Sequence, residues 1–418
     1  MSMGTQTMPK LRFPGFTGDW EQRKLGSISN IIDPHPSHRA PTEVSVGIPF
    51  IGIGDVDAMG NIDANSARTV AEEIYDEHHR RYDLNVPSLG IGRVASLGKV
   101  IRLRNDIGKY AVSPTMSIVQ IRDEVNIDYL YSCMESPIFQ KQFAAQSNGS
   151  TRQSVGIQDL RELIVSVPRN DEEQKTIGAF FKNLDNTITL HQRKCDEIIE
   201  LKKGMLQKMF PKEGESEPEI RFLGFAGDWE QRKLGKLTEI KDSARIPNAE
   251  WSESGVPYIR ASDISNEDIN GILFISPERY EYYRARTGAP SQGDVLFNGG
   301  GEIGKALLNA DDKPIYVQGG AVLYARTSVS ESLDGQFLKT YFETPSAKNY
   351  IDVASAGGTM KHFTLKPALE MPLCIPDIPE QIIIGNFFRS LDNLITLHQR
   401  KCDEFKTLKK AFLQQMFV

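Results

Sequence analysis

The 418-residue sequence lacks the features of several large protein classes. Its apolar runs are far shorter than the roughly 20 residues of a membrane-spanning helix. The opening segment, MSMGTQTMPKLRF, has no apolar core of the kind that a signal peptide carries. Cysteine is scarce, and Cys133, Cys195, Cys374 and Cys402 form no CxxC pair or disulfide framework. These absences predict a soluble protein in the reducing environment of the cytoplasm.

A basic excess is missing too. The sequence has 49 Lys and Arg against 55 Asp and Glu, which gives a formal net charge of -6. Domains that grip nucleic acid alone usually carry a clear positive balance. The composition therefore disfavours a protein that binds nucleic acid tightly without partners.

Signatures of catalysis are also absent. The sequence contains no GxSxG, no HExxH, no paired-carboxylate motif and no NPPY or DPPY string of adenine methyltransferases. Two histidine pairs, His35/His38 and His78/His79, lack further ligands at a convincing spacing, so solvated loops are expected there. The sequence predicts a binding protein without a catalytic, metal or cofactor site of its own.

One glycine-rich stretch resembles a nucleotide-binding loop. Residues Gly299–Lys305, GGGEIGK, match the first seven positions of a P-loop, but Ala306 stands where the Mg²⁺-binding hydroxyl belongs. Arg93 falls at the position of the first glycine in the other half of the chain. A turn that brings the backbone close to a partner, such as DNA phosphate, is the preferred interpretation.

What the sequence has in abundance is repetition. The segment Gln174–Phe210 recurs 207 residues later as Gln381–Phe417, and ITLHQRKCDE is identical in both copies. Neither copy contains proline, and apolar residues follow a heptad spacing for about five heptads. Each copy is predicted to be a helix of ~55 Å with a narrow apolar seam. Because such a helix cannot bury its seam alone, the two copies are expected to pair.

The seam carries the same irregular residues in both copies. His191 and His398 occupy matching positions, as do Lys202 and Lys409. A polar layer that fixes the register of the helices is the preferred interpretation of the histidines. The alternative is a metal site completed by the cysteines one seam step away.

The repeat extends over the whole chain. Leu11–Gly26 and Ile220–Gly235 are identical at thirteen of sixteen positions, and weaker matches between these segments and the helices keep an offset of 206 to 209. The chain is therefore one unit of about 208 residues present twice. The polar linker Pro211–Glu219 joins the copies. The ends of the copies match closely and the middles poorly, which favours one scaffold with two different recognition surfaces.

Short β-rich runs alternate with turn residues in each globular part, so the fold class is α+β with mixed α/β domains. A single helix is expected at Ile127–Gln146 and another at Leu333–Ala354. The domain boundaries follow: a globular domain over 1–168, a long helix over 169–211, a second globular domain over 212–376 and a second long helix over 377–418.

Matching loops near the end of each globular domain suit nucleic acid. Gly149–Ser154 reads GSTRQS and Gly357–His362 reads GGTMKH. Small residues, hydroxyls and cations fit phosphate contact, while Gln or His can reach a base edge. A plain turn between a helix and a strand, with solvated charges, remains the alternative.

These motifs resemble the specificity subunit of type I restriction–modification systems. The resemblance covers nearly the whole chain, and its most specific part is the LDNxITLHQRK…LKK…LxQxMF helix that closes each repeat. It implies two target recognition domains that read the halves of a bipartite double-stranded DNA sequence. The paired helices would form an antiparallel coiled coil, with an internal pseudo-two-fold repeat, that sets the spacing. Two modification (methyltransferase) subunits would dock on this frame.

The resemblance further implies that restriction (motor/nuclease) subunits can join the complex. S-adenosylmethionine, ATP and Mg²⁺ would then bind the partner subunits and not this chain. A coiled-coil adaptor without DNA binding, or a nucleotide-binding enzyme, are the alternatives. Loop position and side-chain chemistry select the candidate DNA-binding residues, which are Arg93, Lys99, Ser150, Thr151, Arg152, Gln153, Arg260, Asn298, Lys305, Thr359, Lys361 and His362.

Overall fold

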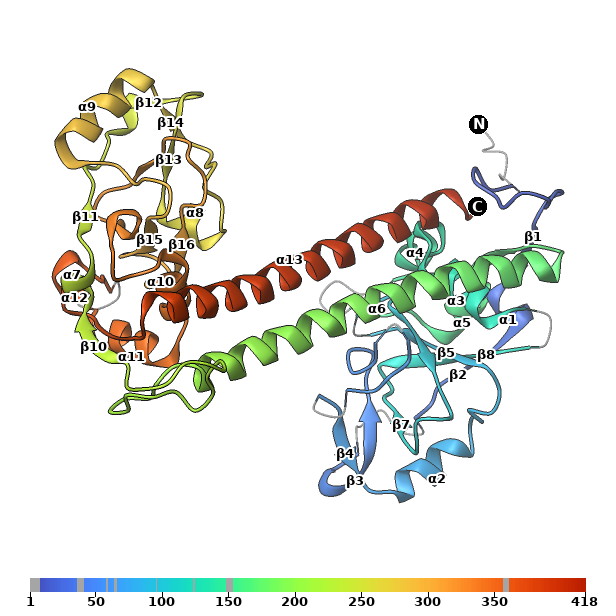
Figure 1. Cartoon of the computed structure of the whole chain (residues 1–418). Coiled ribbons are helices and arrows are strands. Elements are labelled where there is room, and N and C mark those ends of the chain that lie inside the picture. Colours follow the sequence, from blue (N-terminus) through green and yellow to red (C-terminus); the bar gives the residue numbers. More distant parts are fainter. Residues whose placement is uncertain are drawn as a thin grey trace. The chain divides into compact units, whose positions relative to one another are not determined.

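The computed structural model describes residues 8–35, 41–57, 59–63, 66–94, 96–122, 125–147, 153–355 and 361–418. The chain divides into a first unit, Met1–Lys194 with His398–Val418, and a second unit, Cys195–Leu397. Each unit contains a globular domain and one half of each of two long helices, α6 (Asp171–Lys208) and α13 (Ile378–Gln415), which Figure 1 labels.

The described residues of the first globular domain form three small sheets. Their strand orders are β2-β8-β5-β6, β4-β3-β7 and β1-β9. The strands are β1 (Glu21–Lys24), β2 (Ser29–Ile32), β3 (Glu43–Ile51), β4 (Arg68–Val70), β5 (Ser88–Gly92), β6 (Val100–Leu103), β7 (Ala111–Val112), β8 (Met116–Ile121) and β9 (Ile164–Val167). The helices before α6 are α1 (Leu25–Ile28), α2 (Glu73–His79), α3 (Ile127–Glu135), α4 (Pro137–Ala145) and α5 (Ile157–Glu162).

The second unit repeats this plan. Its sheets have the orders β11-β18-β15-β16, β12-β14-β13-β17 and β10-β19. The strands are β10 (Glu230–Lys233), β11 (Ile240–Asp242), β12 (Trp251–Ser252), β13 (Val256–Ile259), β14 (Phe274–Ile275), β15 (Val295–Asn298), β16 (Ala306–Leu308), β17 (Tyr316–Val317), β18 (Val322–Ala325) and β19 (Pro372–Ile375). The helices are α7 (Leu234–Leu237), η1 (Asn248–Glu250), α8 (Ala261–Ser265), α9 (Pro277–Thr287), η2 (Thr327–Val329), α10 (Gly335–Tyr341), α11 (Pro345–Ala354) and α12 (Leu365–Glu370).

The duplicated EQRK segment is a strand in both units. β1 pairs antiparallel with β9, with Glu21 opposite Val167, and β10 pairs with β19, with Glu230 opposite Ile375. The pairing places the start of each globular domain beside the strand that leads into the following long helix. The two domains are therefore closed at their ends in the same way.

An arginine in the anchor segment ties each domain to its long helix. Arg12 donates to Glu173 at 2.6 and 2.7 Å, and Arg221 donates to Glu380 at 2.7 and 2.8 Å. Paired hydrogen bonds between guanidinium and carboxylate fix orientation as well as distance. The acidic partners lie in the first turns of the helices, where negative charge is stabilised by the helix dipole.

The single helices expected at Ile127–Gln146 and Leu333–Ala354 are each two helices, so these two predictions are wrong in that respect. The hydroxyls of Ser136 and Thr344 accept from backbone amides three residues ahead, and a proline follows each of them. A capping hydroxyl with proline in the first turn starts a new helix and ends the preceding one.

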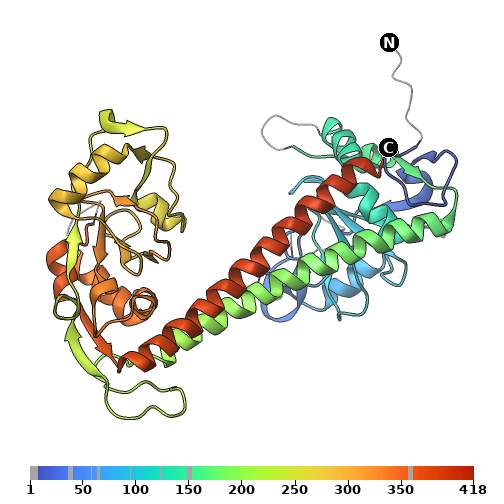
Figure 2. The ribbon, with the colours of Figure 1, turned by 45° about the horizontal axis from the view of Figure 1, so that its top comes forward.

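The long helices pair antiparallel within each unit. In the first unit Phe180 packs edge-on against Phe412, with 5.0 Å between the ring centroids, and His191 faces His398. Residue numbers therefore rise along one helix as they fall along the other. In the second unit Cys195 contacts the carbonyl of Ile395. Figure 2 shows the paired halves within each unit. The predicted antiparallel pairing through the heptad seam is confirmed in both units.

The two seam lysines lie in matching clusters of charge. Lys409 contacts Asp185 at 2.6 Å and Glu135 at 2.5 Å in the first unit. Lys202 contacts Asp392 at 2.5 Å and also Glu343 in the second unit. Burial works to raise the pKa of Asp392, but Lys339 and Lys202 outweigh it and lower the pKa. Each cluster joins both long helices to the globular domain of its own unit.

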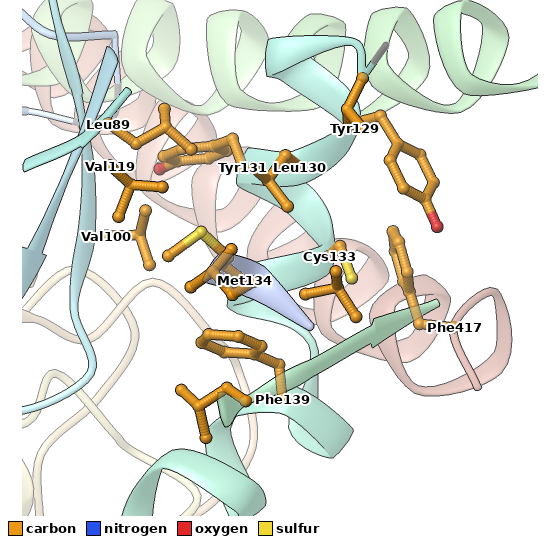
Figure 3. Close-up of a cluster of buried hydrophobic side chains, with 14 of the residues drawn as sticks. Leu89, Val100, Val119, Tyr129, Leu130, Tyr131, Cys133, Met134, Phe139 and Phe417 are labelled. Atoms are coloured by element: carbon orange, nitrogen blue, oxygen red, sulfur yellow. The ribbon is translucent and has the colours of Figure 1, made fainter. Parts of the chain in front are cut away.

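The hydrophobic core of the first unit includes the end of the chain. Figure 3 shows Phe417 beside Tyr129 of α3, and their ring centroids lie 5.7 Å apart. Trp20 of the anchor segment packs edge-on against both rings. Phe417, Trp20 and Tyr129 are all buried. Phe417, just beyond the end of α13, therefore completes a core to which the anchor segment contributes Trp20.

Candidate nucleic-acid interface

A hairpin loop between β15 and β16 holds the glycine-rich stretch of the second unit. The amide of Asn298 donates to the carbonyl of Lys305, and Gly304 donates back to Asn298, both at 2.9 Å. Gly301 and Gly304 have φ angles of 71° and 78°, in the region that glycine adopts without strain. The glycines therefore permit a tight turn that carries Lys305 at its end.

The loop between β5 and β6 of the first unit has the same hydrogen bonds. Gly92 donates to Lys99, and Gly98, with φ of 78°, donates back to Gly92. The amide of Arg93 donates to Thr115, as that of Gly299 donates to Ala321 in the second unit. One backbone frame thus presents different side chains in the two domains.

This frame excludes the P-loop interpretation of GGGEIGK. A P-loop leads from a strand into a helix, but β16 follows here and pairs antiparallel with β15. The amides of Gly299 and Gly300 both donate to the carbonyl of Ala321, so they are not directed at a nucleotide phosphate. The loop gives no support to the alternative of a nucleotide-binding enzyme.

Several candidate residues of the second unit gather around this loop. The side-chain amide of Asn298 donates to the carbonyl of Ala261 at 2.9 Å, which places Arg260 beside the base of the loop. The ring of His362 lies beside Gly300, because a Cβ atom added to that glycine would be 3.4 Å from Nδ1 of His362. The fold therefore brings Arg260, Asn298 and His362 together from three distant parts of the sequence.

The candidate cations of the second unit all have acidic partners. Arg260 pairs with Asp263 at 2.9 Å, and Lys361 pairs with Asp352 at 2.6 Å. The hydrogen bond with Asp263 raises the pKa of Arg260. Lys305 lies 3.5 Å from Glu267. DNA phosphate would have to compete with these carboxylates.

The candidates of the first unit are held differently. Arg93 pairs with Asp33 at 2.9 Å, with both side chains largely buried. Lys99 donates to the carbonyl of Ile53 at 2.8 Å, a neutral partner. Gln153 is exposed and lies two residues before Val155, whose amide donates to the carbonyl of Arg93.

Asn298 is fully buried and its amide also donates to Ser265, so its observed role is to hold the loop in place. That role replaces the DNA-facing position expected for it. Ser150, Thr151, Arg152 and Thr359 lie outside the described residues.

Sequence reasoning missed the carboxylates that pair with these cations. Asp33 is separated from Arg93 by 60 residues, and Glu267 from Lys305 by 38, so no local pattern connects them. Asp263 could have been found, because it stands three residues after Arg260 at the start of a helix. That spacing is typical of a side chain that closes a helix N-terminus.

The histidine pairs are not solvated as expected. His35 and His78 are buried, and their rings meet edge to face at 4.6 Å. His79 stacks on Tyr75 at 3.7 Å. His35 does lie outside the helices and strands, but tertiary packing against Phe50 covers its ring. His38 lies outside the described residues.

Acid should destabilise the first unit through His78. Burial, followed by the positive charges of His35, His79 and Arg81, lowers the pKa of His78 from 6.5 to about 4. Because the unfolded chain binds this proton more readily, the stabilisation is complete above pH 6.5 and is lost as pH falls towards 4. The loss is at most about 3.5 kcal/mol, because one pKa unit corresponds to ~1.4 kcal/mol.

The measurement is the free energy of unfolding of the full chain in urea at pH 7.5 and pH 5. Hydrogen exchange of the α2 amides at the same two pH values locates the loss in the first unit. His78→Phe keeps an aromatic ring and should flatten the pH dependence. An equal acid loss in that variant would show that another group is responsible.

The predicted histidine layer in the helix seam is confirmed. Nδ1 of His191 lies 2.9 Å from Nδ1 of His398, a distance at which one ring donates and the other accepts. Burial and the charge of His398 lower the pKa of His191. Among the described residues no group of three or more His, Cys, Asp or Glu is arranged to hold a metal ion.

Within the described part of the chain, no helix is both long enough and apolar enough to cross a membrane.

Comparison with known proteins identifies several similar chains. A family model described as the type I restriction modification DNA specificity domain matches residues 17–200 and again residues 226–407. The MjaVIII specificity subunit of a type I restriction enzyme from Methanocaldococcus jannaschii is 24% identical over 75% of each chain. The putative MjaX specificity subunit of the same organism is 22% identical over 96% of this chain and 93% of its own length.

Among solved structures, the S subunit of a type I restriction–modification system from M. genitalium has a similar fold. The TM-score is 0.64 at 15% sequence identity, over 98% of this chain and 99% of that chain. The predicted fold class, two tandem mixed domains each followed by a long helix, is confirmed.

Proposed function

Because this chain belongs to the family of type I restriction–modification DNA specificity subunits, we propose that each of its globular domains reads one half of a bipartite DNA target. The observation that carries this proposal is the duplicated hairpin loop. Its backbone hydrogen bonds are the same in both units, while Arg93 in one stands at the place of Gly299 in the other. A shared frame with different side chains fits two readers of different sequences.

The candidate side chains divide by chemistry. Arg93, Lys99, Arg260, Lys305 and Lys361 suit DNA phosphates, together with Ser150, Thr151, Arg152 and Thr359 of the matching loops. Gln153 and His362 are exposed and suit base edges. Phosphate contacts would position each domain, and the amide and imidazole side chains would contribute to sequence preference.

The long helices would set the spacing of the half-sites and carry the partner subunits. Leu190 and Leu397, at matching positions, are 51% and 42% exposed, and Leu201 and Leu408 are 46% and 42% exposed. Repeated apolar side chains on an outer helix face are typical of a protein interface. Their duplication supports two modification subunits for each chain, to which restriction subunits would bind in turn.

Catalysis would belong to those partners. Neither copy of the repeat carries a catalytic signature, which supports a chain without an activity of its own. S-adenosylmethionine, ATP and Mg²⁺ would bind the modification and restriction subunits. Cys133, Cys195, Cys374 and Cys402, which all lie in the described part of the chain, form no disulfide, and this supports a reducing, cytoplasmic setting.

A chain with two copies of the second domain tests the proposal. The strand pairings β1–β9 and β10–β19 have the same register, so residues 27–163 can be replaced by residues 236–371 with both closures kept. We expect the modification complex to methylate a motif that contains the second half-site twice and lacks the first. Methylation-sensitive sequencing of host DNA identifies the motif.

The matched control replaces residues 236–371 by residues 27–163 and should give the first half-site twice. If either chimaera folds, assembles and still methylates the parental motif, independent reading by the two domains is wrong.

A further inference from the structure

One ion pair at the second hairpin loop is formed by a residue in an unfavourable backbone conformation. Glu267 has a φ angle of 56°, in the left-handed region that residues other than glycine, asparagine and aspartate rarely adopt. It directly follows Asn266, the C-cap of α8. Glycine is the common residue at this position after a C-cap. A glutamate in this conformation costs free energy, and residues in such conformations cluster at functional sites.

The side chain of Glu267 is directed at the candidate phosphate-binding lysine. Its Oε1 lies 3.5 Å from Nζ of Lys305, and the two side chains are 58% and 41% exposed. Lys305 ends the hairpin loop, directly after Gly304. The pair therefore lies at the surface, where an incoming phosphate can reach the ammonium group.

We propose that Glu267 competes with DNA phosphate for Lys305 and so lowers the affinity of the second domain for DNA of any sequence. The inference rests on the proposed function, in which Lys305 binds phosphate. A lysine ammonium is a compact point charge that pairs with carboxylate or phosphate. When DNA arrives, Lys305 must leave Glu267, or the carboxylate must stay beside the phosphate and repel it.

The first unit offers an internal contrast. Lys99 occupies the place of Lys305 in the duplicated loop, but its Nζ donates to the neutral carbonyl of Ile53. No carboxylate of the described residues pairs with Lys99, so none of these has to be displaced when phosphate binds. Competition by an acidic residue at this lysine position is thus specific to the second domain, and the shared loop frame does not require it.

The expected consequence is weaker binding to non-target DNA. Phosphate contacts supply most of the affinity for non-specific DNA, which outnumbers the target greatly in a cell. A carboxylate that opposes one such contact shortens the time spent on non-target sites. It does so without touching the groups that read bases.

The test measures DNA binding by the full-length chain in complex with its modification subunits, at one fixed salt concentration. The probes are one duplex that contains the motif methylated by the complex, itself unmethylated, and one duplex that lacks this motif. Glu267→Gln should tighten binding to both duplexes roughly two- to fivefold, the range expected for an exposed ion pair. Lys305→Ala should weaken binding to both and reduce the salt slope by about one.

Two further variants make the comparison specific. In the Lys305→Ala background, Glu267→Gln should have no effect, because the ammonium group for which it competes is gone. Glu302→Gln removes a carboxylate from the same exposed loop without breaking the pair with Lys305, and should change affinity less. Glu267→Asn removes the charge with a residue that tolerates left-handed backbone, which guards against misfolding.

The outcomes separate the inference from the function it rests on. If Lys305→Ala weakens binding and Glu267→Gln leaves it unchanged, Lys305 binds DNA and the competition is refuted. If Lys305→Ala has no effect on affinity or salt slope, the phosphate contact itself is wrong and the inference falls with it. Tightening by Glu267→Gln that persists without Lys305 would also overturn the inference.

Discussion

Adding one heptad to both long helices is expected to lengthen the gap between the half-sites by about three base pairs. Seven residues add ~10.5 Å of helix at 1.5 Å per residue, and one base pair of B-DNA advances ~3.4 Å. The insertions belong between Lys194 and Cys195 in α6 and between Leu397 and His398 in α13. Both half-sites should stay the same, since no loop of either domain is touched.

The placement keeps the seam intact. Both insertions fall between the His191–His398 contact and the Cys195–Ile395 contact, so neither layer is broken. A full heptad preserves the apolar repeat in each helix. Methylation of the parental motif should fall, because its half-sites are then about three base pairs too close together for the lengthened helices.

The methylated motif, read from genomic DNA, is the measurement. The matched control adds seven Gly and Ser residues between Glu213 and Gly214, in the exposed linker, and should leave the motif unchanged. An unchanged gap in an active heptad variant would show that the helices hold the partners and do not set the spacing.

Removal of Asp185 should destabilise the first unit by about 3 to 5 kcal/mol, the cost of breaking a buried ion pair. Asp185 is almost fully buried, and it accepts from Lys409 of α13 and from Arg102 of β6. Asp185→Ala leaves both cations with one carboxylate fewer in a dry environment. The variant should also loosen the attachment of α13, because Lys409 joins that helix to α6.

Hydrogen exchange of α3 amides in the full chain measures this loss. The control is Glu162→Ala, which removes an exposed carboxylate paired with Lys24 and should cost less than about 1 kcal/mol. Losses of the same size in the two variants would contradict a structural role for the buried cluster.

The sequence predicted those parts of the fold that repetition and periodicity determine. The heptad seam indicated the long helices and their pairing, because a narrow apolar stripe on a long helix is buried by packing against a second helix. The break at Ser136 was missed, although Pro137 marks it, because apolar residues continue in step on both sides. Local capping outweighed periodicity there.

Predictions for the candidate site were limited by distance along the chain. The duplicated loop could be found because glycine and lysine recur at a fixed offset. The acidic partners could not, because Asp33 and Glu267 meet their cations only after the sheets have formed. The burial of Asn298 has the same cause, since its partners in α8 lie more than 30 residues away.

The place of Phe417 in the core affects the order in which the two units can complete their folding during synthesis. The second unit is one continuous stretch, Cys195–Leu397, and can fold once that stretch has left the ribosome. The first unit is begun before the second but needs His398–Val418, which are synthesised only after Cys195–Leu397. Until then the site that Phe417 fills beside Trp20 and Tyr129 stays open. A chain that stops before Phe417 would therefore leave the core of the first domain incomplete.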